Sequence, residues 1–299
     1  MHLVWTIEPN GLWERDWIYD LLDGVPVQET EDAGRQGMHP GAMLVINHSY
    51  PYMAYLQKYE DAGVPYMVWH LSDETLGDDL GYVGHTACRF VVRNYLHPRL
   101  YGNPKVLVVG LGYKTGYVDA LRGLAGAAAK DLLWSFSGAV WHEDRARCLE
   151  VLGGMVGRRE VHVSGTGPGA AFGGGLDTAT YARMLARSVF VPAPIGQGNL
   201  ESFRVFEALE AGAIPVVLAR QAVQPWWPSY WHGLFPGGGG TPEGAIVIAE
   251  DWEDARRQIE AAVAQGVGHL EEKLRKARAF WDGAKAAWRA EIAARVADG

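Results

Sequence analysis

Cysteine is almost absent from this chain of 299 residues, which carries only Cys88 and Cys148. Two cysteines are too few for a disulfide framework or a zinc site, and they indicate a reducing compartment. Runs of lysine or arginine are also absent, and the formal net charge is −8. An acidic chain without a basic patch is not expected to bind nucleic acid, so this class of partner is excluded.

Long apolar stretches are missing as well. No run approaches the roughly 20 residues that a membrane-spanning helix needs, so we expect no transmembrane segment. The opening residues, MHLVWTIEPNG, have neither the basic nor the apolar region of a signal peptide and are typical of a first β-strand. These features predict a cytoplasmic protein.

Motifs that hold metal ions or nucleoside triphosphates are not found. The chain contains no H-E-x-x-H, no paired C-x-x-C and no Walker lysine, which excludes metalloproteases, zinc modules and P-loop kinases. A D-x-D pair is lacking too. Asp251 and Glu253 come closest, but they lie at a predicted helix start, where acids favour the positive end of the dipole. We therefore expect no metal and no cofactor.

What the chain does have is a regular alternation of strand-like and helix-like segments. Strands are predicted at 3–7, 43–47, 66–71, 89–93, 106–110, 132–136, 160–164, 189–192, 214–218 and 245–248. Helices are predicted at 13–22, 52–62, 144–155, 178–186, 200–211, 251–264 and 268–294. The alternation predicts an α/β fold of two doubly wound, Rossmann-like domains with parallel sheets. The small-residue patch GLAGAAAKD divides them into domains at 1–125 and 126–299.

The most informative segment is GNLESFRVFEALEAGAIPVVL, residues 198–218. It follows a predicted strand, opens with a glycine loop, and continues as a helix for which Asn199 is a suitable N-cap. Gly212 ends that helix, and IPVVL begins a buried strand. A helix N-terminus presented by a glycine loop at a strand end predicts an anion site, because its free N–H groups point outward.

Two side chains on this helix sharpen the prediction. Arg204 and Glu207 are three residues apart and share a face with Ala208 and Ala211. An arginine suits a phosphate and a carboxylate suits paired sugar hydroxyls, which together match a nucleotide diphosphate-sugar. The alternative is a plain ion pair between Arg204 and Glu207 on a solvated helix face.

The segment at 181–218 resembles the donor-binding segment of exostosin-type glycosyltransferases, and most closely their ribitol-phosphate xylosyltransferase branch. The matching residues are Tyr181, Leu185, Ser188, Phe190, Pro194, Gly196, Asn199, Glu201, Phe203, Arg204, Glu207, Ala208, Leu209, Glu210, Gly212, Ile214 and Pro215. Ala193 departs from the pattern, because many relatives carry cysteine there. Weaker similarity extends upstream through WHLSDE, VVRNY, VLVVGLGYKTGY and WSFSG.

The resemblance implies a GT-B fold, in which two domains face a cleft and a terminal helix braces the first domain. It implies an inverting, metal-independent transfer from a UDP-sugar, with xylose favoured, to a glycan or polyol-phosphate acceptor. The first domain would bind the acceptor and the second the nucleotide-sugar. Membrane anchoring, which is usual among animal relatives, has no counterpart in this sequence.

The resemblance also implies residue roles on the donor side. Glu207 would accept hydrogen bonds from the ribose, while Arg204 and Arg145 would neutralise the departing diphosphate. The remaining donor-binding residues are expected to be Lys114, Ser137, Gly138, Gly196, Asn199, Glu201 and Ser202.

An inverting transfer needs a base for the acceptor hydroxyl. Asp73 and Glu74 follow one predicted strand and His48 follows another, and the two acids are favoured over His48. Arg93 is expected to position the acceptor, or simply to pair with one of these acids. Trp226 and Trp227, in an aromatic cluster, are expected to stack on acceptor sugar rings or to pack within their own loop.

Other functions stay open. A nucleotide-sugar hydrolase or epimerase, or a silent nucleotide-sugar-binding protein, would use the same fold. GLGYKTG at 110–116 also fits a dinucleotide-binding loop of an oxidoreductase, although the next strand lacks the acidic residue that holds a ribose.

Overall fold

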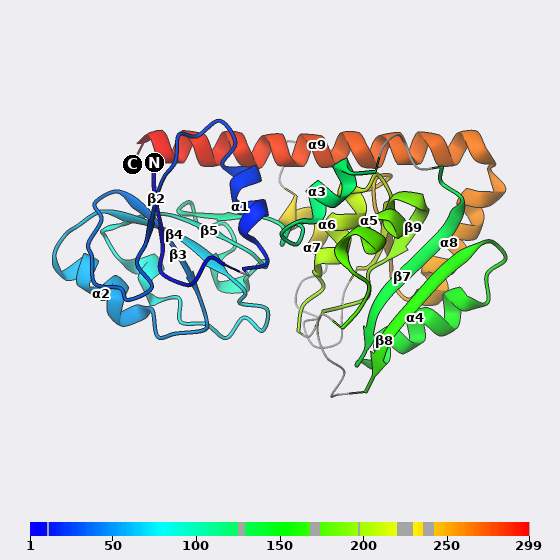
Figure 1. Ribbon diagram of the computed structural model, residues 1–299, viewed down its shortest axis with the longest axis horizontal. Coiled ribbons are helices and arrows are strands. Elements are labelled where there is room, and N and C mark those ends of the chain that lie inside the picture. Colours follow the sequence, from blue (N-terminus) through cyan, green and yellow to red (C-terminus); the bar gives the residue numbers. More distant parts are fainter. Residues whose placement is uncertain are drawn as a thin grey trace. The chain divides into compact units, whose positions relative to one another are not determined.

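The computed structural model describes residues 1–10, 12–124, 129–167, 174–196, 198–219, 230–235 and 242–298. The chain forms two compact units, Met1–Gly110 with Lys285–Gly299, and Leu111–Ala284. Each unit contains one parallel sheet, as the ribbon in Figure 1 shows. The predicted division between residues 125 and 126 falls in a segment outside the described residues, whereas the compact units divide after Gly110 and after Ala284.

The first unit is built on a six-stranded sheet in the order β2-β1-β3-β4-β5-β6. Its strands are β1 (His2–Trp5), β2 (Gln28–Glu31), β3 (Ala42–Asn47), β4 (Tyr66–Leu71), β5 (Cys88–Arg93) and β6 (Val106–Val108). The connections include helices α1 (Arg15–Leu21) and α2 (Met53–Asp61) and the 3₁₀ turns η1 (Gly81–Gly84) and η2 (Pro98–Leu100).

The core of this unit explains its central strands. Every residue of β4 is buried, as is every residue of β3 except Asn47, because helices and loops cover both faces of a parallel sheet. The helix α2 contributes Tyr55, Leu56 and Tyr59 to the same apolar cluster. Continuous apolar runs are therefore required here, and they are what the sequence shows.

The last part of helix α9 (Val267–Asp298) belongs to this first unit, from Lys285 onward. Trp288 meets Trp17 of α1 edge-on, with ring centroids 6.0 Å apart. Arg289 donates from Nε to the carbonyl oxygen of Asp20 at 2.7 Å. The indole of Trp17 in turn donates to the carbonyl oxygen of Gly110 at 2.9 Å, so the end of the helix is locked into the unit.

The second unit has a five-stranded sheet in the order β11-β10-β9-β7-β8. Its strands are β7 (Leu132–Val140), β8 (Arg159–Thr166), β9 (Ser188–Pro192), β10 (Ile214–Leu218) and β11 (Val247–Ala249). Its helices are α3 (Tyr117–Arg122), α4 (Glu143–Gly153), α5 (Thr178–Arg187), α6 (Phe203–Glu210), α7 (Tyr230–Leu234), α8 (Trp252–Ala264) and the first part of α9.

Both sheets follow the same doubly wound order. In each, the first strand (β1 or β7) lies between the second and third, and all pairings are parallel. The chain therefore reverses its direction of winding beside β1 and beside β7. In open parallel sheets, ligands bind beyond the carboxyl ends of the strands at such a switch point.

The predicted α/β fold of two parallel, doubly wound sheets is confirmed. The bounds of β4 and β10 match the predicted segments 66–71 and 214–218. The prediction that Asn199 is the N-cap of this helix was wrong, because α6 begins at Phe203 and its N-cap is Ser202. Strand β7 also runs beyond the predicted 132–136 to Val140, so Ser137 and Gly138 lie inside it.

Within the described residues, no helix is long and apolar enough to cross a membrane.

Candidate functional site

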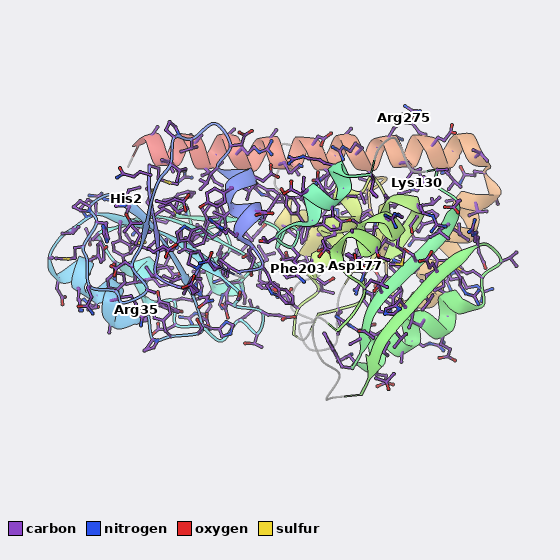
Figure 2. All side chains as sticks on the ribbon, in the orientation of Figure 1. His2, Arg35, Lys130, Asp177, Phe203 and Arg275 are labelled. Atoms are coloured by element: carbon purple, nitrogen blue, oxygen red, sulfur yellow. The ribbon has the colours of Figure 1, made fainter. Side chains whose placement is uncertain are left out.

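The switch point of the second unit gathers most of the residues that the sequence singles out. The chain leaves β9 at Pro192, and the N–H of Gly196 donates to the carbonyl oxygen of Asn199 at 2.9 Å. This turn leads to Ser202, whose extended backbone (φ −143°, ψ 158°) opens α6. In Figure 2, Phe203 marks the start of that helix.

Arg204 is held at this point by β7. One guanidinium nitrogen, Nη2, donates to the carbonyl oxygen of Ser137 at 2.6 Å, and the guanidinium lies 4.6 Å from the ring centroid of Phe136. Gly138 makes room for it, because its φ is +151° and an added Cβ would stand 2.6 Å from Nη2. The glycine at 138 is therefore a requirement of the close approach between β7 and the arginine.

Several buried donors around Arg204 lack hydrogen-bond partners within the part of the chain that the structure describes. They are Nε and Nη1 of Arg204, Nδ2 of Asn199 and the hydroxyl of Ser202. Arg204 is 8% exposed and Asn199 is fully buried. An unsatisfied buried polar group costs about 1–3 kcal/mol, so a cluster of donors requires an explanation. Its chemistry suits an anion, because all three side chains offer N–H or O–H groups.

Glu207 lies one turn further along α6, at 5% exposure. Its Oε2 accepts the Tyr181 hydroxyl at 2.9 Å and its Oε1 accepts the backbone N–H of Lys114 at 3.3 Å. Burial raises the pKa of Glu207, although these hydrogen bonds and the charges of Arg204 and Lys114 oppose the shift. No ion pair joins Arg204 to Glu207 in the described residues, so the plain surface pair considered above does not form.

Tyr181 is a site residue that the sequence left without a role. It comes from α5, whose N-cap residue Asp177 is labelled in Figure 2. The carboxylate of Asp177 accepts the N–H of Thr180 at 2.9 Å. The neighbouring Tyr117 donates its hydroxyl to the backbone carbonyl of Glu207 at 2.8 Å. The match of Tyr181 to the family pattern was the signal, but only the fold brings its hydroxyl to Glu207.

Glu201 and Arg145 hold loops of this unit together. Glu201 is fully buried, accepts the N–H of Leu111 at 3.0 Å and contacts the hydroxyl of Tyr230. Arg145 donates to the carbonyl oxygens of Ala139 at 2.9 Å and Ile195 at 3.1 Å. Both side chains therefore brace the backbone beside the candidate site.

The glycine loop at 110–116 does not form the βαβ unit of a dinucleotide-binding domain. The strand before it, β6, is the last of the first sheet, whereas α3 after it belongs to the second unit. Two of its N–H groups, those of Leu111 and Lys114, donate to glutamate side chains. The loop thus lacks the context that a dinucleotide fingerprint needs.

In the first unit, the structure brings Asp73 and Arg93 together. Nη2 of Arg93 donates to Oδ2 of Asp73 at 2.9 Å, with side chains 0% and 1% exposed. Asp73 also accepts the N–H of Asp78 at 3.1 Å, and Nε of Arg93 donates to two backbone carbonyls. The pairing that the sequence left as an alternative for Arg93 is the one observed.

The other predicted residues are placed differently. His48 is exposed after β3, and Glu74 is half-buried after β4. Trp226 and Trp227 lie outside the described residues. Across the described part of the chain, no cluster of three or more histidine, cysteine or acidic side chains could hold a metal ion.

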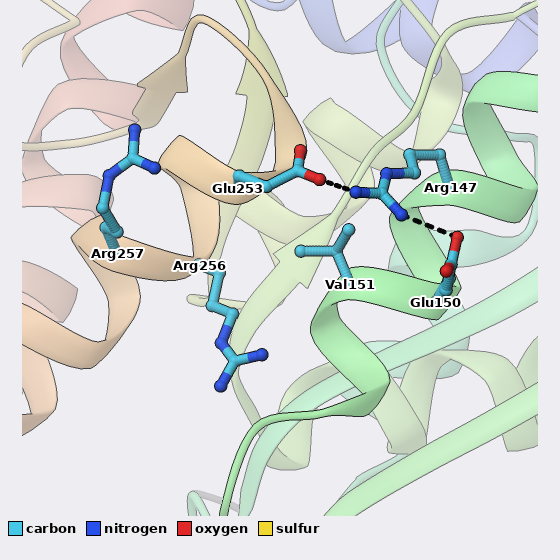
Figure 3. Close-up of a pocket in the computed structure, with 6 residues that line it drawn as sticks. All are labelled: Arg147, Glu150, Val151, Glu253, Arg256 and Arg257. Carbon is cyan, nitrogen blue, oxygen red and sulfur yellow. Dashed lines mark hydrogen bonds and ion pairs between the residues drawn. The ribbon is translucent and has the colours of Figure 1, made fainter.

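A surface pocket on α4 and α8 differs from the candidate site in its charged side chains, which are paired with one another (Figure 3). It is lined by Arg147, Glu150, Val151, Glu253, Arg256 and Arg257. Arg147 pairs with Glu150 at 2.8 Å and contacts Glu253, while Arg256 and Arg257 pair with Glu260 and Asp254. Because each arginine already forms an ion pair with a carboxylate, this pocket is a solvated surface of paired charges.

Two doubly wound units of parallel strands in one chain agree with the GT-B fold that the sequence predicts. Among solved structures, the chain is similar to HepE from Anabaena in complex with UDP, with a TM-score of 0.52 and 9% identity over 100% of both chains. At this identity the likeness establishes the fold. No protein-family model matches the chain, and no curated protein matches its sequence.

Weaker similarity is found to UGT2 from Phytolacca americana. Its complex with UDP-2-fluoro-glucose and pterostilbene aligns with a TM-score of 0.44 and 11% identity, over 85% of this chain and 76% of that one. Its apo form aligns with a TM-score of 0.40 and 12% identity, over 99% and 92%.

Proposed function

We propose that this protein is a UDP-sugar-dependent glycosyltransferase whose donor site lies at the switch point of the second unit. The observation that carries the proposal is the set of buried, unpartnered donors on Asn199, Ser202 and Arg204. A diphosphate offers several charged acceptor oxygens, and it would satisfy all three side chains at once. The same groups would stabilise the charge that develops on the leaving diphosphate.

The nucleoside would extend toward Glu207. Each of its carboxylate oxygens already accepts one hydrogen bond, and each can accept another. Paired ribose hydroxyls would supply those two donors. Uridine is favoured because HepE, which shares the fold, was solved with UDP, and because segment 181–218 resembles the exostosin donor segment.

The finer parts of the proposal rest on that resemblance. Xylose is the favoured sugar, transfer inverts the anomeric centre without a metal ion, and the acceptor is a glycan or a polyol-phosphate. Gly196, Glu201, Arg145 and Lys114 support the donor site through the backbone contacts described above.

Calorimetric titration with UDP tests the donor site. Arg204→Ala and Glu207→Gln are each expected to weaken UDP binding about 10- to 100-fold, because a hydrogen bond to a charged group contributes about 1.5–3 kcal/mol. The matched control is Arg147→Ala, an exposed arginine on α4 that is paired with Glu150. Unchanged UDP affinity in both site variants, with native melting temperatures, would refute the assignment.

Ligand selectivity tests the nucleotide. A ligand that binds only the native state raises its melting temperature. We expect a rise with UDP and none with GDP, CMP, dTDP or NADPH. A rise with NADPH alone would favour an oxidoreductase.

Product analysis separates transfer from its alternatives. Turnover of a UDP-sugar without acceptor would indicate a hydrolase or epimerase, and UDP binding without any turnover would indicate a silent binding protein.

A further inference from the structure

The first unit has its own switch point, beside β1, and a buried carboxylate lies there. Glu14 ends the loop that leads from β1 to α1 and is 5% exposed. Its Oε1 accepts the hydroxyl of Ser72, which follows β4, at 3.0 Å. The charge of His48, which follows β3, lowers the pKa of the same carboxylate. The loops after β1 and β4 thus meet at Glu14.

Ser72 adopts a conformation that is uncommon for a residue with a side chain. Its φ is +65°, in the left-handed region, which costs an ordinary residue about 1–2 kcal/mol. Such outliers persist where surrounding structure enforces them and concentrate at functional sites. Here the enforced geometry directs the serine hydroxyl onto Glu14.

The Ser72 hydroxyl holds the Glu14 carboxylate at Oε1, and a backbone N–H adds a second hydrogen bond to the carboxylate. Among the residues that the structure describes, no side chain donates a hydrogen bond to Oε2 of Glu14, whereas Asp73 is bonded at both oxygens. A base must reach the hydroxyl whose proton it takes, within about 2.6–3.2 Å. Of these two buried acids, Asp73 is held in an ion pair with Arg93, which weakens it as a base, whereas the Glu14 carboxylate has no arginine or lysine partner among the described residues.

We propose that Glu14 is the general base that deprotonates the acceptor hydroxyl, a role that rests on the glycosyltransferase function proposed above. The hydroxyl proton passes to Oε2 of Glu14 as the acceptor oxygen bonds to the anomeric carbon. The bond between that carbon and the diphosphate oxygen breaks, and UDP leaves with the electron pair. Glu14 then returns the proton to solvent.

The electrostatics of the site fit this role. Burial raises the pKa of Glu14, while the Ser72 hydrogen bond, a backbone N–H and the charge of His48 oppose the shift. A raised pKa strengthens a carboxylate as a base. Because the base acts when deprotonated, activity is expected to rise with pH through the pKa of Glu14.

The test compares Glu14→Gln with Glu8→Gln, a matched change at an exposed glutamate of the same loop. Turnover is read as UDP release from UDP-xylose, with ribitol 5-phosphate and a methyl xyloside as acceptors. Glu14→Gln is expected to lower kcat about 100-fold or more, the usual contribution of a general base, with UDP affinity and melting temperature retained. Glu8→Gln is expected to keep the kcat of the native protein.

The pH profile of the variant His48→Ala tests the role of Glu14 further, because a purely structural role of Glu14 would not change that profile. Loss of the histidine charge is expected to shift the acidic limb of the kcat/KM profile to higher pH while kcat at high pH is kept. Collapse of kcat in His48→Ala, with Glu14→Gln active, would make His48 the base. If the native protein is active and the kcat of Glu14→Gln lies within threefold of the native kcat, the role of Glu14 is overturned but the transferase function stands. If the native protein binds UDP but releases no UDP from UDP-xylose, the transferase function itself is overturned.

Discussion

The two units share one strand order but present opposite chemistry at their switch points. Beside β7, the second unit offers unpartnered donors from Asn199, Ser202 and Arg204. Beside β1, the first unit offers a buried carboxylate, Glu14, whereas Arg93 at the end of β5 is already paired with Asp73. Under the proposed function, the shared topology places both sites at the carboxyl ends of strands, while the loop residues set the charge that each site offers to a ligand.

The largest effect is expected from breaking the buried pair of the first unit. Asp73→Ala leaves the Arg93 guanidinium charged, buried and without its carboxylate partner. Removal of one partner from a buried ion pair destabilises a protein by about 3–5 kcal/mol. Urea unfolding followed by tryptophan fluorescence would measure the loss. A loss below 1 kcal/mol would show that the pair is not structural and would return Asp73 to the candidates for the base.

The next effect is expected at the strand that holds the arginine of the second unit. Gly138→Ala places a Cβ 2.6 Å from Nη2 of Arg204, at a φ of +151° that alanine rarely adopts. The guanidinium must move, so UDP affinity is expected to fall about tenfold, close to 1.4 kcal/mol. Calorimetry on Gly138→Ala and on Gly153→Ala, where an added Cβ meets nothing within 4 Å, would measure it. Equal UDP affinities in the two variants would separate Gly138 from the donor site.

A smaller effect sharpens the comparison, because each unit contains a buried glutamate whose pKa is raised. Burial raises the pKa of Glu14 and of Glu207 above the ordinary value of 4.5. Folding then favours the protonated form of these two groups, so their contribution to stability is highest below pH 4.5 and declines as the pH rises through their folded-state pKa. Either glutamine variant is expected to flatten this decline in melting temperature as the pH rises above 4.5.

The functional consequences of those two variants should divide between the units. Glu207→Gln is expected to lower UDP affinity, and Glu14→Gln to lower kcat alone. Loss of both properties in both variants would mean that the two switch points do not have separate roles.

The smallest effect is expected at an exposed ion pair. Asp119 and Arg122 lie 3.0 Å apart with side chains 77% and 75% exposed. Exposed pairs contribute about 0–1 kcal/mol, so Asp119→Ala should leave both stability and UDP binding close to native. A larger loss of stability in Asp119→Ala than in Asp73→Ala would contradict the contrast between buried and exposed pairs.

The sequence predicted the parts of the fold where burial is uniform. The runs 66–71 and 214–218 are apolar because both faces are covered, and their bounds match β4 and β10. The strand β2 was missed because its residues, QETE, are half-buried or exposed at the sheet edge. An edge strand of this composition has no apolar alternation for a pattern to detect.

The candidate site was predictable where its residues are close in sequence. Asn199, Ser202 and Arg204 lie on one segment, and a loop followed by a helix is enough to suggest an anion. Glu14 could not be found in this way, because its partner Ser72 is 58 residues away and depends on the packing of separate loops. For Arg93, the sequence offered pairing with Asp73 or Glu74 as one alternative, and only the folded sheet shows that its partner is Asp73.

Helix α9 has a consequence for how the chain is made. Trp288 and Ile292, 2% and 0% exposed, belong to the first unit although they lie near the far end of the chain. Synthesis delivers the 110 N-terminal residues of that unit first, yet its core stays incomplete until residues 285–298 have left the ribosome. The second unit is complete earlier. The unit whose first 110 residues are translated earliest is therefore expected to be the unit that finishes folding last.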